Sequence, residues 1–88
     1  MEILQSAFRH GVQADDMQHV LKNALVIEEV AGDPIRYLVL GPERSGNLHE
    51  LVVMDRQQGP AVIHAMAMTE QYRDLLPKGW KPMGWKPQ

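Results

Sequence analysis

The sequence predicts a single α+β domain: a two-layer sandwich with an antiparallel meander of about four strands and helices on one face. Three observations support this fold class. Residues 14–25 carry apolar side chains at helical spacing. Four later runs are short and rich in Val, Ile and Leu, as β-strands are. The links between these runs are short, which favours antiparallel neighbours. The predicted element order is α-α-β-β-β-β-α, and helices at both ends of the chain would cover the same face.

The N-terminal part is predicted to be helical. Residues 3–10 form either a short helix or an extended entry with one helical turn, and Gly11 stops it. The helix over 14–25 begins with two acids, Asp15 and Asp16, which the helix dipole favours in the first turn. Its apolar face is expected to consist of Met17, Val20, Leu21 and Ala24.

Four strands follow, over residues 25–30, 35–41, 48–55 and 61–68. Their connections, 31–34, 42–47 and 56–60, contain the Gly and Pro residues typical of turns. Pro60 cannot donate to a strand ladder, so we expect it in the turn or at the first position of the last strand. Thr69 is a good N-cap residue for a closing helix over 70–76, which Pro77 ends. That helix is expected to turn Tyr72, Leu75 and Leu76 inward.

Length and composition limit the alternatives. The chain has 88 residues, room for one domain, which we place at 1–77. Residues 78–88 form a tail that contains Gly-Trp-Lys-Pro twice, at 79–82 and 84–87. We interpret it as extended or mobile, with stacking of Trp80 and Trp85 on bases or a partner as the alternative.

The chain contains no cysteine, which excludes disulfides and cysteine-based zinc sites. It has no apolar run of membrane-spanning length and no signal-peptide pattern at residues 1–5, so a cytoplasmic protein without membrane contact is expected. The formal net charge of −2 does not indicate a broad phosphate-binding face.

The strand register decides which polar side chains meet, because side chains alternate between the two faces of a sheet. We assume that Leu40 pairs with Leu48 and Asp55 with Ala61. One face then carries Arg36, Leu38, Leu40, Leu48, Glu50, Val52, Met54, Val62, His64, Met66 and Met68. The other carries Ile35, Tyr37, Val39, His49, Leu51, Val53, Ala61, Ile63, Ala65 and Ala67, and we assign it to the helix-covered core. The first face would stay open, and uncovered apolar surface usually marks a partner site.

Several segments resemble one known family. These are Phe8-Arg-His-Gly-Val12 with Asp15-Asp16 at a helix start, Arg36–Gly41, Leu48–Val53 and Ile63–Thr69 with Tyr72-Arg73. Over residues 6–76 they resemble BrnT-like proteins, the toxins of type II toxin–antitoxin pairs, which have a RelE-like ribonuclease fold. The first strand of that fold would have to come from residues 2–4. The resemblance implies an endoribonuclease that is neutralised by a cognate antitoxin, which could be of the ribbon-helix-helix type.

Cleavage of RNA by such a toxin needs a base, an acid and a cation that stabilises the phosphate, and no metal or other cofactor. Glu50 and His64 are the candidate base and acid, with Arg36 beside them. A structural role is the alternative for each: a hydrogen-bonded histidine, or an ion pair between Glu50 and Arg36. The candidate RNA-binding residues are Arg44, Arg73 and His10. Their alternatives are an exposed charge for Arg44, a salt bridge for Arg73 and a helix-end cation for His10.

The open face also predicts protein contacts. The candidate partner interface consists of Leu38, Leu40, Val52 and Met66. It would bind the antitoxin or another protein partner, and a homodimer is a separate expectation. The sequence therefore supports two functions: a metal-independent toxin ribonuclease, or a non-catalytic protein-interaction module of the same fold. A zinc site from His49, Glu50 and His64 is not expected, because neighbouring residues on a strand point to opposite faces.

Overall fold

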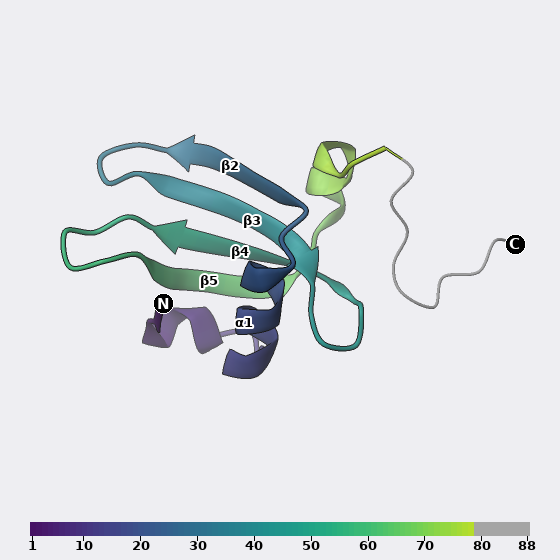
Figure 1. Cartoon of the computed structure of the whole chain (residues 1–88), viewed down its shortest axis with the longest axis horizontal. Helices are drawn as coiled ribbons and strands as arrows, with labels where there is room; N and C mark the ends of the chain where they lie inside the picture. Colours follow the sequence, from purple (N-terminus) through teal and green to yellow (C-terminus); the bar gives the residue numbers. More distant parts are fainter. Residues whose placement is uncertain (79–88) are drawn as a thin grey trace, which may run out of the picture.

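The computed structural model, which describes residues 1–78, is an α+β domain with one α-helix packed on a five-stranded mixed sheet (Figure 1). Its strand order is β1-β5-β4-β3-β2, in which β2 to β5 form an antiparallel meander and β1 lies parallel to β5. The elements in chain order are β1 (Glu2–Ile3), the 3-10 helix η1 (Gln5–Phe8), α1 (Ala14–Lys22), β2 (Val26–Ala31), β3 (Arg36–Pro42), β4 (Leu48–Met54), β5 (Ala61–Ala67) and the 3-10 helix η2 (Glu70–Leu75). The predicted four-stranded meander is confirmed. The predictions for residues 79–88, including Trp80 and Trp85, lie outside the described residues.

The core lies between α1 and one face of the sheet. Met17 and Val20 of α1 are fully buried and pack with residues from the middle strands and from the segment before the helix. Gly41 lets the end of α1 approach β3, because a Cβ atom there would lie 3.1 Å from the backbone oxygen of Asn23. The buried cluster consists of Ala7, Val12, Met17, Val20, Val39, Leu51, Val53, Val62 and Ala65.

The observed register keeps most of the predicted faces. Leu40 pairs with Glu50 rather than with Leu48, a difference of two residues that leaves the faces of β3 and β4 unchanged. Between β4 and β5 the predicted register holds where Val52 pairs with His64. A register shift next to this pair then brings Val53 opposite Val62. Such an irregularity reverses the alternation, so the prediction for Val62 was wrong and this residue belongs to the core under α1. The prediction for Ala61 was wrong for the same reason, since Ala61 pairs with Met54 on the opposite face.

The N-terminal segment covers the free edge of β5. Ile3 of β1 pairs with Val62, and the backbone N–H of Leu4 donates to the oxygen of Val62 at 2.9 Å. The Ser6 hydroxyl then donates to the carbonyl of Ile63 at 2.7 Å. Gly11 ends this segment with φ +79°, a conformation in which the lack of a Cβ atom removes the steric penalty.

The C-terminal segment departs from the prediction. Residues 70–75 form a 3-10 helix with no buried residue, and Leu75 is 40 % exposed rather than turned inward. Thr69 precedes this helix as predicted, but its side chain does not cap it and instead donates to Glu50. Glu50 lies on the sheet face opposite α1, so the start of η2 lies there too. The expectation that all helices cover one face was therefore wrong.

Candidate functional site

A buried carboxylate organises the face of the sheet that α1 does not cover. Glu50 of β4 is only 5 % exposed. Its Oε2 accepts hydrogen bonds from the backbone N–H and the hydroxyl of Thr69, both at 2.9 Å. Its Oε1 lies 3.2 Å from Nε2 of His64. A carboxylate removed from water needs such partners, since an unpaired one would be costly to bury. Glu50 therefore joins β4, β5 and the start of η2.

His64 is the accessible member of this pair. It lies on β5 opposite Val52, one step diagonally from Glu50, and 32 % of its side chain is exposed. If Nε2 carries the proton that is donated to Glu50, Nδ1 is left as the nitrogen that can accept a proton. A carboxylate that holds one imidazole nitrogen fixes the orientation of the ring and stabilises the imidazolium. Glu50 and His64 thus form a dyad suited to proton transfer.

His10 joins the dyad from the other end of the chain. Its ring centroid lies 5.6 Å from that of His64, and the rings are nearly perpendicular at 77°. His10 follows η1, which the hydrogen bond from Ser6 to Ile63 holds against the edge of β5. The exposed His10 and half-exposed His64 give the site two imidazoles next to one buried carboxylate.

Sequence reasoning identified Glu50, His64 and His10 but did not bring all three together. His10 was considered for RNA binding, and only the chain path along β5 reveals that it reaches His64. Thr69 was expected to cap a helix and not to hold the carboxylate. Its two hydrogen bonds to Glu50 could not be found from spacing, because they depend on how the chain crosses the sheet after β5.

Arg36 is not part of this cluster. It shares the sheet face of Glu50, but it pairs with Met54, whereas Glu50 pairs with Leu40. Four residues along a strand separate the two positions, roughly 13 Å. The predicted group of Arg36, Glu50 and His64 was therefore wrong for Arg36. Within residues 1–78 its Nε is a buried side-chain nitrogen with no hydrogen-bond partner.

The two predicted RNA-binding arginines are engaged with acids. Arg44 Nε donates to Asp16 at 2.8 Å, and its other nitrogens contact Gln13 and Asp15. This hydrogen bond lowers the pKa of the Asp16 carboxyl and raises the pKa of Arg44. Arg73 binds both carboxylate oxygens of Glu70, at 2.8 and 2.9 Å.

Arg73 differs from Arg44 in its position. The Arg73 hydrogen bonds lower the pKa of Glu70 and raise that of Arg73 itself. Arg73 follows Thr69 by four residues and so belongs to the segment that contacts Glu50. Arg44 instead joins the loop after β3 to the start of α1.

The predicted partner interface is half buried within the chain itself. Leu38 and Leu40 are 2 % and 0 % exposed, so the face opposite α1 is not open at these positions and they offer no surface to a partner. Val52 and Met66 are partly exposed. Their contact with a partner stays a prediction.

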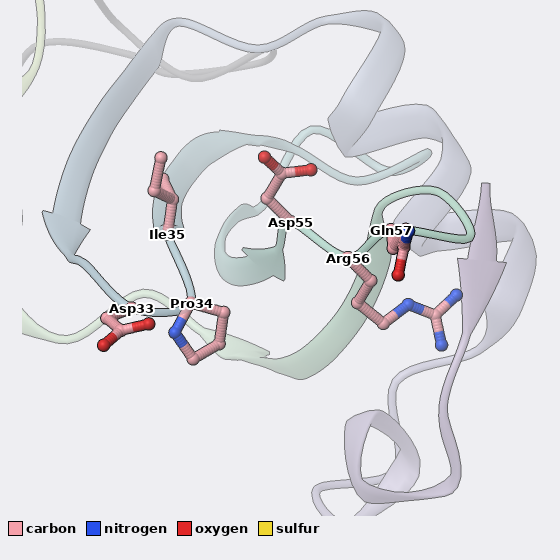
Figure 2. A pocket seen from close by; sticks show the side chains of 6 residues that line it. All are labelled: Asp33, Pro34, Ile35, Asp55, Arg56 and Gln57. Atoms are coloured by element: carbon pink, nitrogen blue, oxygen red, sulfur yellow. The ribbon is translucent and has the colours of Figure 1, made fainter.

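A separate hollow lies at the turn end of the sheet. It has a volume of about 500 Å³ and is lined by Asp33, Pro34, Ile35, Asp55, Arg56 and Gln57 (Figure 2). Arg56 turns out of it to bind Glu2 at 2.6 Å and the carbonyl of Gly59. Asp55 follows the last residue of β4 and is five residues from Glu50, so this side of the hollow lies roughly 17 Å from the dyad along the strand.

Residues 1–78 contain no group of three or more His, Asp or Glu side chains arranged to hold a metal ion. None of the helices in this range is both long and apolar enough to cross a membrane. Comparison of the chain with known proteins found no matching family model, no matching curated protein and no matching solved structure.

Proposed function

We propose that this chain is a metal-independent endoribonuclease with a BrnT-like fold, the toxin of a type II toxin–antitoxin pair. The observation that carries the proposal is the contact of two accessible imidazoles, His10 and His64, one of which is held by a buried carboxylate. Two neighbouring imidazoles can supply the base and the acid that RNA cleavage needs. The helix on an antiparallel meander and the short first strand β1 agree with the fold that the sequence resemblance implies.

The roles follow from the hydrogen bonds. Nδ1 of His64 takes the proton of the ribose 2′-hydroxyl, and the 2′-oxygen attacks the adjacent phosphorus. Glu50 stabilises the imidazolium that forms, which favours His64 as the base. The bond from phosphorus to the 5′-oxygen breaks, and protonated His10 gives its proton to that leaving oxygen. The products are a 2′,3′-cyclic phosphate and a 5′-hydroxyl. Because Glu50 acts through His64, it is a positioning residue and not the general base.

The phosphate also needs a cation in the crowded transition state. Arg73 is the better placed of the two predicted RNA-binding arginines, because η2 begins beside Glu50. A phosphate would replace Glu70 as its bidentate partner. Arg44 would first have to leave Asp16.

The test is induced expression of the full chain in cells, with growth and newly formed 5′-hydroxyl RNA ends as readouts. Wild type should arrest growth and produce such ends, and co-expression of the neighbouring antitoxin gene should restore growth. His64→Ala and His10→Ala should each remove both effects while the purified variants remain folded. His49→Ala is the matched control, because His49 adjoins Glu50 in sequence but pairs with Ala67 outside the cluster; it should stay toxic. Normal growth and intact RNA with wild type would contradict the proposal.

The alternative function, a non-catalytic interaction module, has its own support. Within residues 1–78, Arg44, Arg56 and Arg73 are all ion-paired with acids of the same chain, which reduces the charge offered to RNA. Under this alternative, His64→Ala lowers stability and leaves partner binding intact.

A further inference from the structure

The outer edge of β2 combines an unpaired strand edge with exposed apolar side chains. β2 pairs only with β3, so one side of its backbone has no strand partner within residues 1–78. Two of its side chains are large, apolar and exposed: Ile27 at 65 % and Val30 at 54 %. Ile27 pairs with the buried Val39, so both side chains lie on the face of the sheet on which α1 packs. α1 covers Val39 but does not extend over Ile27.

The same strand carries two neighbouring acids. Glu28 and Glu29 are exposed, and no ion pair involves either of them among residues 1–78. Charged residues and bulges protect sheet edges from pairing with other chains, and β2 has a register shift between Glu29 and Ala31. Protection accounts for the acids and the shift. It does not account for the exposed Ile27 and Val30, which make an edge more adhesive.

The negative charges of Glu28 and Glu29 determine which kind of chain could pair with β2. Antiparallel pairing with a second copy through β2 would place the acids of both copies close together, and like charges across a strand pair are destabilising. A segment with Lys or Arg opposite these acids and apolar residues opposite Ile27 and Val30 would satisfy both features. Main-chain hydrogen bonds would supply the remaining affinity, as in other complexes in which a peptide extends a sheet.

We infer that β2 is a docking edge for an extended segment of another protein, with the pattern apolar-basic-basic-apolar, which adds as a sixth strand. This inference does not depend on the ribonuclease proposal, since the dyad lies on β4 and β5. The inferred partner surface is the exposed edge of β2 and not the surface predicted at Leu38 and Leu40, which are buried.

The probe is the synthetic peptide acetyl-Lys-Thr-Val-Arg-Lys-Ile-Thr-amide, titrated into the full chain and followed by amide chemical shifts. We expect saturable shifts concentrated at residues 26–30. Glu28→Lys and Ile27→Thr should each weaken binding at least about tenfold. Asp74→Lys, the same charge change on the exposed η2, is the matched control and should change affinity less than about twofold.

A second peptide isolates the backbone contribution. It has the same side chains but is N-methylated at alternate residues, so it keeps the charge and loses main-chain donors. Binding through an added strand requires that this peptide fail to bind. The inference is overturned if it binds equally well, if the shifts fall outside β2, or if the chain pairs with itself through β2.

Discussion

The two edges of the sheet are treated in opposite ways. At β5 the N-terminal segment covers the edge: β1 pairs with it, and the Ser6 hydroxyl satisfies the carbonyl of Ile63. At β2 the outer side of the backbone has no strand partner within residues 1–78, and the exposed side chains are apolar and acidic. The covered edge is also where His10 meets His64. The difference shows how a small domain can use one edge to assemble a site and leave the other accessible.

The largest expected effect of a single substitution is at the buried carboxylate of Glu50, on β4 next to the covered strand β5. Glu50→Ala removes the acceptor of Thr69 and His64, and hydrogen bonds to a charged group are among the strongest. We expect the free energy of unfolding to fall by about 3 kcal/mol, measured by urea denaturation. Glu29→Ala at the outer edge of β2 is the control and should change it by less than about 0.5 kcal/mol. Equal effects of the two substitutions would mean that the hydrogen bonds of Glu50 do not stabilise the fold.

A smaller effect is expected where the N-terminal segment is attached. Ser6→Ala removes the hydroxyl that donates to Ile63 at 2.7 Å. We expect a loss of about 1 kcal/mol in the free energy of unfolding and faster hydrogen exchange of amides in residues 2–8. Ser45→Ala, in the loop after β3, is the matched control, because the hydroxyl of Ser45 makes no hydrogen bond within residues 1–78. Unchanged exchange in the Ser6 variant would mean that β1 alone holds the segment.

Periodicity and turn residues were enough to predict the meander, and less was predictable for the site. Strand order followed from short links between apolar runs, since consecutive strands with short connections pair. The bulge that moves Val62 into the core left no sequence signal, and a single irregularity reverses the alternation beyond it. The contact of His10 with His64 joins residues 54 positions apart through a two-residue strand. Such long-range placement depends on packing that local patterns do not encode.

At the outer edge of β2, a substitution should weaken peptide binding and leave the free energy of unfolding nearly unchanged. Ile27→Thr exchanges one β-branched residue for another at a position that is 65 % exposed. The free energy of unfolding should therefore change by less than about 0.5 kcal/mol, measured by thermal and urea denaturation together. Val39→Thr at the buried position across the strand pair is the comparison, and it should cost more than about 1 kcal/mol because it buries a hydroxyl. A large loss of stability with Ile27→Thr would mean that β2 supports the fold and is not a spare edge.

The smallest expected effect concerns Asp16, which is ion-paired with Arg44, whereas Glu28 and Glu29 of β2 have no ion pair within residues 1–78. The hydrogen bond from Arg44 holds the pKa of the Asp16 carboxyl below its usual value. A carboxylate whose pKa is lowered on folding contributes stability above its unfolded-state pKa, and this contribution disappears as the pH falls through the folded-state pKa. We expect a titration of the Asp16 carboxyl ¹³C shift to have its midpoint below that of unfolded aspartate. Arg44→Gln should return it towards the ordinary value and loosen the loop after β3. A midpoint that Arg44→Gln does not move would mean that this exposed pair does not form in solution, and Arg44 would then be available to RNA.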